Sequence, residues 1–343
     1  MPLLTVAATE WAPGAEAPTL APALAKAADH LAAGELLAFP TETVYGLGAR
    51  ADDDAAVAGI YRAKGRPSGH PLIVHVADVD AAAGFALAIG APARRLMQAF
   101  WPGPLTLILP RRPGRAAAAA GGQDSIGLRM PAHPLALALL RAAAQRGVPG
   151  VAGPSANRFG RISPTTAAHV VQEFGDALWV LDGGPCAVGI ESAIVDCTRP
   201  TPALLRPGQL GRDRIEFVLG HALAAPDAAS PRASGTLASH YAPRARVRLF
   251  DASPEASTLM DDGLRFGART QGGVAVYSRT PWPAGPVAVV WRQMPQDPDA
   301  AAQVLFSALR ELDAQGVHTI WVERPPAGPA WDGVRDRLQR AAA

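Results

Sequence analysis

Short apolar runs rich in β-branched residues alternate with segments of helical spacing along most of this chain. Residues 72–76 (Leu-Ile-Val-His-Val) are typical of a strand, because the run is short and β-branched. Residues 22–33 show the helical pattern, with apolar side chains three and four positions apart, a proline near the start and Gly34 just past the end. Strands and helices mixed in this order predict an α/β or α+β domain that ends near Leu219.

The same two patterns predict the other elements. Aspartates 52–54 supply N-caps for a helix that should stop around residues 64–67. Further strands are expected at 36–39, 105–109, 126–130, 148–152, 179–181, 193–195, 247–250, 274–277, 287–291 and 317–322. Further helices are expected at 91–100, 135–146, 165–174, 257–266 and 300–315.

A small and polar stretch separates the chain into two parts. With 343 residues, the chain exceeds the roughly 250–300 residues at which a single hydrophobic core stops growing. Residues 221–244 include Ala-Pro-Asp-Ala-Ala-Ser-Pro-Arg-Ala-Ser-Gly, a composition typical of a linker. We therefore predict a first domain over 1–220, a linker or lid over 221–244 and a smaller α/β domain over 245–343.

The overall charge is nearly balanced, with 32 basic and 30 acidic side chains. No basic tail or stripe marks a dedicated nucleic-acid binder, although a local basic patch is compatible with this balance. The start of the chain lacks the pattern of a secretory signal, and the longest stretch without polar side chains, 81–93, is too short to span a bilayer. We therefore expect a soluble, cytoplasmic protein.

Common catalytic motifs are missing from the sequence. Neither of the two lysines, Lys26 and Lys64, follows a glycine, so the sequence contains no Walker A phosphate loop. The segment 45–48 (Tyr-Gly-Leu-Gly) lacks the third glycine of a dinucleotide-binding loop, and Ser155 does not lie in a Gly-x-Ser-x-Gly motif. The sequence has no His-Glu-x-x-His or paired Cys-x-x-Cys motif for zinc, so we expect no metal site built from protein side chains.

Three polar loops lie beside predicted strands, where binding residues tend to occur, and the third comprises residues 125–129 and 155–163. The first, 40–46, offers hydroxyls to a small polar ligand, or else forms a turn that caps the following segment. In the second, 64–71, Lys64 and Arg66 flank a glycine, so that two cations can converge on a phosphate. The alternative is a solvated helix C-terminus, where basic side chains interact favourably with the helix dipole.

Arg129 and His75 each lie in a predicted strand with apolar neighbours. A semi-buried arginine needs an anionic partner, which is either an aspartate or glutamate of the protein or a substrate carboxylate. A histidine in an apolar strand is more often a hydrogen-bonded core residue than a ligand. Each of these features is weak by itself, so their meaning depends on their combination.

The combination forms an ordered series of motifs over about residues 20–245. The motifs are Pro-Thr-Glu-Thr-Val-Tyr-Gly-Leu-Gly (40–48), Lys-Gly-Arg-Pro (64–67), Pro-Leu-Ile-Val-His-Val (71–76), Trp-Pro-Gly-Pro-Leu-Thr (101–106), Gly-Leu-Arg-Met-Pro (127–131), Pro-Ser-Ala-Asn (154–157), Glu-Ser-Ala-Ile-Val-Asp (191–196), Leu-Arg-Pro-Gly (205–208) and His-Tyr-Ala-Pro (240–243). This series resembles the YrdC-like family, and the second predicted domain resembles its longer, two-domain branch.

The resemblance implies an L-threonylcarbamoyladenylate synthase, a nucleotidyltransferase. Such an enzyme joins L-threonine, bicarbonate and ATP into threonylcarbamoyl-AMP and releases pyrophosphate. Other proteins, the downstream threonylcarbamoyl transferase machinery, then modify an adenosine beside the anticodon of tRNA. The implied fold is a YrdC-like twisted, open α/β domain with a concave substrate face, followed by a smaller Rossmann-like α/β domain.

The resemblance also assigns roles to individual residues. The catalytic cations would be Lys64 and Arg66, which neutralise charge at the α-phosphorus as the carbamate oxygen attacks. Mg²⁺ would arrive on the triphosphate, held mostly by water and phosphate oxygens. L-Threonine would be bound by Thr43, His75, Arg129 (at the carboxylate), the Gly153 backbone and Ser192. ATP would be bound by Arg66, His70, Ser125, Ser155, Asn157, Ser163, Arg206 and Tyr241.

Some positions depart from the family pattern. His70 stands where many members have asparagine, and Gly153 stands where a side chain is common, so a contact at Gly153 would use its backbone. Residues 234–239 (Ser-Gly-Thr-Leu-Ala-Ser), directly ahead of His240, lack the basic residues that some members carry. If Tyr241 reaches the nucleotide, the linker is a lid, and we hypothesise that ATP orders residues 232–243 over the cleft.

Two other functions compete with this interpretation. One is a non-catalytic module that binds double-stranded RNA or tRNA, because family members have a concave basic surface; its mark would be an RNA affinity that falls steeply with salt. The other is a carbamoyl-transfer module like that of hydrogenase-maturation enzymes. Those enzymes carry additional acylphosphatase-like and zinc-finger regions, for which this chain has neither the length nor the cysteines.

Overall fold

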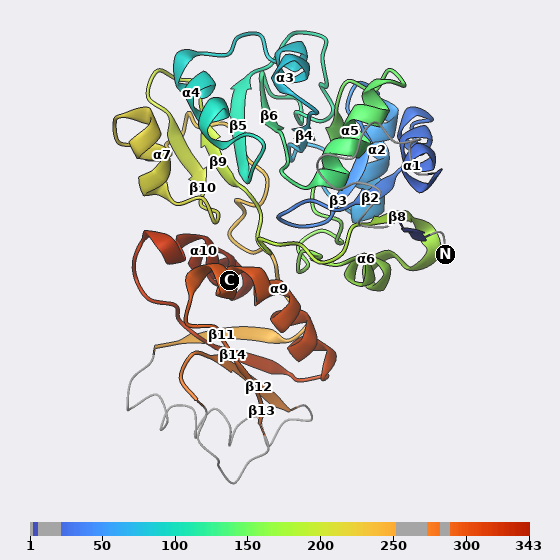
Figure 1. Ribbon diagram of the computed structural model, residues 1–343. Coiled ribbons are helices and arrows are strands. Elements are labelled where there is room, and N and C mark those ends of the chain that lie inside the picture. The colour runs from blue at the N-terminus through green and yellow to red at the C-terminus, as the bar shows by residue number, and fades with distance from the viewer. Residues whose placement is uncertain (1–2, 6–21, 252–272, 282–288) are drawn as a thin grey trace. The chain divides into compact units, whose positions relative to one another are not determined.

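Two sheets organise the chain, one in each of two separately packed units of the computed structural model (Figure 1). The structure describes residues 3–5, 22–251, 273–281 and 289–343. Unit 1 comprises residues 1–159 and 163–236, and unit 2 comprises residues 160–162 and 237–343. The segment expected as a linker, 221–244, is thereby divided between the two units after residue 236.

Unit 1 is built on a mixed sheet whose described strands follow the order β1-β8-β2-β3-β7-β4-β6-β5-β9-β10. Strand β8 is parallel to β1 and β2, β4 is parallel to β6, and β5 is parallel to β9, whereas the other pairs are antiparallel. The strands are β1 (Leu3–Thr5), β2 (Leu37–Phe39), β3 (Gly46–Arg50), β4 (Ile73–His75), β5 (Leu105–Pro110), β6 (Ser125–Arg129), β7 (Val151–Ala152), β8 (Trp179–Asp182), β9 (Ala193–Asp196) and β10 (Ala203–Arg206).

The helices of unit 1 follow the capping signals in the sequence. In α2 (Asp54–Lys64), the Asp53 carboxylate accepts the N–H groups of Ala55 and Ala56, and Gly65 ends the helix with a φ of 63°. The remaining helices are α1 (Pro22–Ala32), α3 (Val79–Phe85), α4 (Ala91–Phe100), α5 (Pro134–Ala144), α6 (Ala167–Phe174), the 3₁₀ turn η2 (Gly175–Ala177) and α7 (Arg212–Leu219). The predicted α/β class is therefore confirmed for this unit.

Four neighbouring strands of unit 1, β4, β6, β5 and β9, have one apolar face and one mixed face. On the apolar face, side chains such as Leu107 and Leu128 enter the main hydrophobic core. On the opposite face, Ile73, Ile108 and Ile194 form a small separate cluster. Because side chains alternate along a strand, residues two positions from these isoleucines lie on the same mixed face. Polar residues of the predicted motifs occupy those positions.

Unit 2 contains a four-stranded sheet in the order β11-β14-β12-β13, and every pair in it is parallel. The second α/β fold is therefore confirmed. The predicted helix at 257–266 lies outside the described residues. The described elements are β11 (Arg246–Phe250), β12 (Val274–Ser278), β13 (Val290–Gln293), α9 (Pro298–Ala314), β14 (Thr319–Glu323), η3 (Pro329–Trp331) and α10 (Asp332–Ala341).

Several elements were not predicted from the sequence, namely β1, β3, β10, α3, α7 and α10. Strand β3 shows the reason, since Gly46 and Gly48 weaken any strand pattern. A Cβ atom at Gly48 would lie 2.9 Å from Val151 Cγ1 and 3.0 Å from Phe39 Cε1. Close packing against neighbouring strands selects glycine here, and this packing is visible only in the folded sheet.

Candidate substrate site

Arg129 ends β6 on the mixed face of unit 1 and is held by three groups. Its Nη1 donates a hydrogen bond to Thr43 Oγ1 (2.8 Å), and its Nε donates to the Gly103 carbonyl (3.2 Å). Its Nη2 lies 2.7 Å from Glu42 Oε1. Of the two partners that the sequence left open, the structure therefore supplies the protein carboxylate. Thr43, which the resemblance assigns to binding of the substrate L-threonine, is therefore connected to β6 by its hydrogen bond with Arg129.

His75 lies beside Arg129, because these two residues pair in register between β4 and β6. The imidazole is buried and meets the Phe39 ring edge-on, with 5.5 Å between ring centroids. Burial, helped by the nearby Arg129 cation, lowers the pKa of His75 to about 3, so its side chain is neutral at pH 7. His75 therefore offers a ligand a neutral imidazole and no positive charge.

The buried imidazole predicts a specific acid sensitivity. Between the pKa of about 3 in the folded protein and the ordinary value of 6.5, the unfolded chain binds more protons than the native state. The stability that His75 contributes is therefore complete above pH 6.5 and is lost as the pH falls toward 3. In chemical denaturation from pH 7 to pH 4, His75→Gln should flatten the dependence of the unfolding free energy on pH. A His75→Gln curve with the same slope as the wild-type curve would contradict the burial argument.

Gly153 packs directly against His75. Its N–H donates to the Ile73 carbonyl (2.9 Å), so a ligand contact at this residue would use the Gly153 carbonyl. A Cβ atom here would lie 3.1 Å from both His75 Nδ1 and Phe39 Cζ. The glycine that departs from the family pattern is thus explained by the two rings that surround it.

Gly153→Ala is expected to destabilise the protein by about 1–3 kcal/mol, because the added methyl group must displace a packed ring. The free energy of unfolding in urea measures this effect. The matched control is Gly84→Ala in α3, where no atom lies within 4 Å of a new Cβ. Alanine there should be neutral or stabilise by up to about 1 kcal/mol. A loss of similar size at both positions would show that Gly153 is not selected by its rings.

Lys64 ends α2 and is buried under the loop that contains Ser155 and Asn157. Its Nζ donates to the Ser155 carbonyl (2.6 Å) and to the Asn157 carbonyl. Burial, helped by the Arg66 cation, lowers the pKa of Lys64 well below its usual value, while Glu173 and Glu191 act in the opposite direction. The lysine therefore positions this loop, and only its remaining donor capacity could serve a phosphate oxygen.

Arg66 and His70 lie on the same loop and share an aromatic neighbour. Arg66 Nη2 donates to the Pro71 carbonyl (2.9 Å), and its guanidinium carbon lies 5.7 Å from the centre of the Phe159 ring. The His70 imidazole meets that ring edge-on at 5.6 Å. Desolvation and the cations Arg66 and Arg232 lower the pKa of His70, which favours its neutral form. This part of the loop thus combines a cation with flat, uncharged surfaces.

Ser192 and Arg206 are joined on the other side of the mixed face. Arg206 is buried, and its Nε and Nη2 both donate to the Ser192 carbonyl (3.1 and 2.9 Å). The Ser192 hydroxyl lies 2.8 Å from Thr106 Oγ1 and also accepts from Arg206 Nη2 (3.2 Å). Ser163 is linked to Ser192 through Glu191. The Ser163 hydroxyl donates to the Glu191 carboxylate, and Glu191 directly precedes Ser192 in the chain.

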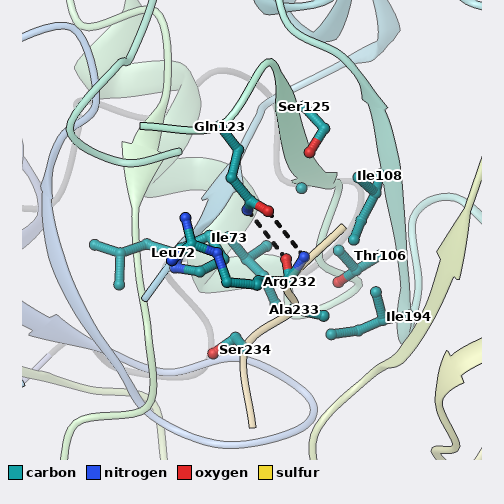
Figure 2. Close-up of a pocket in the computed structure, with 12 residues that line it drawn as sticks. Leu72, Ile73, Thr106, Ile108, Gln123, Ser125, Ile194, Arg232, Ala233 and Ser234 are labelled. Atoms are coloured by element: carbon teal, nitrogen blue, oxygen red, sulfur yellow. Dashed lines mark hydrogen bonds between the residues drawn. The ribbon is translucent and has the colours of Figure 1, made fainter. Parts of the chain in front are cut away.

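A pocket opens on the mixed face between the small isoleucine cluster and the segment 232–234 (Figure 2). Figure 2 shows the Gln123 amide pointing at the backbone of Arg232. Gln123 Oε1 accepts a hydrogen bond from the Arg232 N–H (2.8 Å), and Gln123 Nε2 donates one to the Arg232 carbonyl (3.1 Å). The Ser234 carbonyl accepts from Arg206 Nη1 (2.8 Å), and the Ser234 hydroxyl accepts from Arg66 Nη2 (3.4 Å). Ser125, a predicted ATP residue, also lines this pocket.

Sequence reasoning missed Glu42, Gln123 and Ser234. Glu42 could have been predicted from the sequence, because it belongs to the first motif and Arg129 was expected to need an anionic partner. No local signal pointed to Gln123 or to Ser234, because their contacts join segments that are far apart in the chain.

Tyr241 belongs to unit 2, unlike the other predicted site residues. Its ring is buried, and the ring centroid lies 5.5 Å from that of Phe306 and 4.4 Å from that of His240. The Arg337 guanidinium carbon lies 5.3 Å from the same centroid. Its φ of 62° is unusual for a residue with a side chain. The predicted contact of Tyr241 with ATP stays a prediction.

In the part of the chain that the structure describes, no group of three or more His, Cys, Asp or Glu side chains is placed to hold a metal ion. None of the described helices has the length and apolar character needed to cross a bilayer.

Two family models match the chain. A model described as "Telomere recombination", for the Sua5, YciO and YrdC proteins, matches residues 29–208. A second, described as "Threonylcarbamoyl-AMP synthase, C-terminal domain", matches residues 210–343. Together they cover most of unit 1 and all of unit 2.

Curated relatives and solved structures agree with these matches. Threonylcarbamoyl-AMP synthase of Bacillus subtilis is 38% identical, over 94% of this chain and 93% of its own length. The protein of that name from Pyrococcus abyssi is 37% identical, over 92% of this chain and 93% of its own. The crystal structure of Pyrococcus abyssi Sua5 complexed with L-threonine matches with a TM-score of 0.87 and 33% identity, covering 99% of this chain and 97% of that one.

Proposed function

Given that this chain belongs to the family of two-domain threonylcarbamoyl-AMP synthases, we propose that its substrates bind on the mixed face of unit 1. Its activity is that of a nucleotidyltransferase, which forms threonylcarbamoyl-AMP from L-threonine, bicarbonate and ATP. One observation supports this location above all. Four buried cations, Lys64, Arg66, Arg129 and Arg206, lie around this face and its loops, and the reaction needs cations for one carboxylate and a triphosphate.

L-Threonine would lie at Arg129. The guanidinium would hold the substrate carboxylate, and Thr43 and the neutral His75 would orient the rest of the amino acid. The threonine amine, once it has lost its extra proton, bonds to the carbon of bicarbonate as water leaves, which gives the carbamate. The protein thus contributes position and exclusion of water, for which buried side chains are suited.

ATP would lie toward Arg66, Arg206 and the pocket beside Ser125. The carbamate oxygen of threonine attacks the α-phosphorus, the bond from this phosphorus to the bridging oxygen breaks, and pyrophosphate leaves. Arg66 and Lys64 would stabilise the charge that develops there. Approaching phosphates would also raise the lowered pKa of Lys64, so we expect the lysine to be protonated with nucleotide bound.

Mg²⁺ would enter with ATP. Among the described residues, no group of three or more His, Cys, Asp or Glu side chains is placed to hold the ion, and the Glu191 carboxylate accepts from Ser163. Hydroxyls and carbonyls are the remaining oxygen ligands, which suits an ion held mainly by phosphate and water. When bound, the ion neutralises charge on the triphosphate.

The decisive experiment follows pyrophosphate release from ATP and Mg²⁺, with and without L-threonine and bicarbonate. Release that depends on both, with threonylcarbamoyl-AMP in the mass spectrum of the quenched mixture, is the expected result. A folded protein that binds ATP but forms no product would overturn the proposal.

Of the hypothesised lid 232–243, residues 232–236 belong to unit 1, and we also propose that this part acts as a lid on the site. It already contacts Gln123, Arg66 and Arg206 without substrate, so ATP would have to share or replace these contacts. Tryptic cleavage after the exposed Arg232 should slow when ATP and L-threonine are present. Gln123→Ala should speed cleavage in their absence, because it removes both hydrogen bonds to Arg232. Equal cleavage rates under all conditions would rule out a lid.

Downstream, the mixed anhydride product must pass to an enzyme that transfers the threonylcarbamoyl group to tRNA. We propose that this happens in the cytoplasm, where ATP, threonine and tRNA are together. Direct contact with tRNA is a separate proposal, tested by RNA binding measured at increasing salt, which should weaken it steeply if phosphates are bound.

A further inference from the structure

The Glu42 carboxylate is a buried group without an aligned hydrogen bond. The residue is 8% exposed, and both carboxylate oxygens are buried and accept no hydrogen bond in the described structure. Arg129 Nη2 lies 2.7 Å from Oε1, yet this contact lacks the alignment of a hydrogen bond, and Nη2 is likewise unsatisfied. Buried carboxylates normally accept several hydrogen bonds, so an additional donor is expected at this position.

No described residue donates a hydrogen bond to either carboxylate oxygen of Glu42. Next to it, the Thr43 hydroxyl accepts from Arg129 and lies 2.9 Å from Thr41 Oγ1, whose own proton goes to the Val44 carbonyl. His133 and Cys186 also lie near Glu42, and because burial lowers the pKa of His133 and raises that of the Cys186 thiol, neither supplies the carboxylate with a positive charge at pH 7. Within the described structure, Glu42 is therefore paired with the Arg129 cation, and both Glu42 oxygens and Arg129 Nη2 keep unused hydrogen-bonding capacity.

We propose that Glu42 binds the ammonium group of L-threonine. This inference rests on the proposed function, in which the substrate carboxylate binds Arg129. Free threonine is a zwitterion, and a site that takes a zwitterion out of water needs one anion and one cation. The Glu42–Arg129 pair provides both, 2.7 Å apart, and the three N–H donors of an ammonium would satisfy the two carboxylate oxygens.

In this arrangement Glu42 is a specificity-determining residue. Before substrate binds, the charges of Glu42 and Arg129 compensate each other without an aligned hydrogen bond between them. Threonine then replaces one imperfect contact with two charge-assisted ones, its carboxylate on Arg129 and its ammonium on Glu42. A molecule of the same shape that carries a hydroxyl in place of the ammonium would leave the Glu42 charge uncompensated and should be rejected.

The test compares two ligands by calorimetry on the full chain: L-threonine and 2,3-dihydroxybutanoate of matching configuration. The wild-type protein should bind threonine about 10–100-fold more tightly, the range of a hydrogen bond to a charged group. In Glu42→Gln this preference should shrink to within about threefold. Glu35→Gln, an exposed glutamate in the same unit, should keep the wild-type preference.

The alternative is that Glu42 only positions Arg129. In that case Glu42→Gln would weaken both ligands equally and leave their ratio unchanged, which would overturn the proposal. If Glu42→Gln does not fold, Glu42→Asp keeps the charge on a shorter chain and should still prefer threonine; a lost preference there would also overturn it. The ligand ratio does not depend on ATP chemistry, so it remains informative even if threonine-dependent pyrophosphate release is not observed.

Discussion

Replacing Arg129 with methionine is expected to lower kcat/KM for L-threonine by at least about 100-fold, because one partner of a buried charge pair is removed. Arg129 contacts Glu42, Thr43 and the Gly103 carbonyl at once, so its loss also disconnects the first polar loop from β6. The Glu42 carboxylate is left buried without a cation, at a cost of about 3–5 kcal/mol in stability. Pyrophosphate release at varied threonine concentration and urea denaturation measure the two effects.

A double variant separates these effects. Arg129→Met combined with Glu42→Gln no longer buries an unpaired charge, so most of the lost stability should return while activity stays low. Arg95→Met, at an exposed arginine of α4, is the matched control and should change neither quantity appreciably. Recovery of activity in the double variant would show that Arg129 does not bind substrate.

Replacing Lys64 with methionine is expected to lower kcat/KM for ATP by at least about 100-fold through loss of a charge and of loop position. The ammonium satisfies the buried carbonyls of Ser155 and Asn157, and each carbonyl left unsatisfied costs about 1–3 kcal/mol. Activity and stability should therefore fall together in this variant.

The chain offers an unusually direct control, because Lys26 is its only other lysine. Lys26 is exposed on α1, where its Nζ lies 4.1 Å from the centre of the Trp179 ring. Lys26→Met should cost no more than about 1 kcal/mol, the size of an exposed cation–π contact, and should leave kcat/KM unchanged. A Lys64→Met enzyme that retains activity within a few-fold would refute both roles given to Lys64.

Local signals in the sequence were sufficient for most elements and for the motifs. Asp53 and Gly65 show why, since an N-cap carboxylate and a left-handed glycine act within a few residues of the helix they bound. The glycine-rich strand β3 was missed because its stability comes from Phe39 and Val151 on neighbouring strands. The second role of Lys64 was missed for the same reason. A cation beside a glycine predicted phosphate binding, whereas in the structure the lysine also donates hydrogen bonds to the Ser155 and Asn157 carbonyls.

The sequence by itself determined the alternation of strands and helices, the capping of α2 and the ordered motifs that mark the family. These depend on spacing along the chain, which is local information. Only the tertiary structure decided that Arg129 meets Glu42, that Gln123 holds Arg232 and that Gly153 fits between two rings. Such contacts depend on strand register, and a slip of one residue would turn every side chain of a strand to the other face.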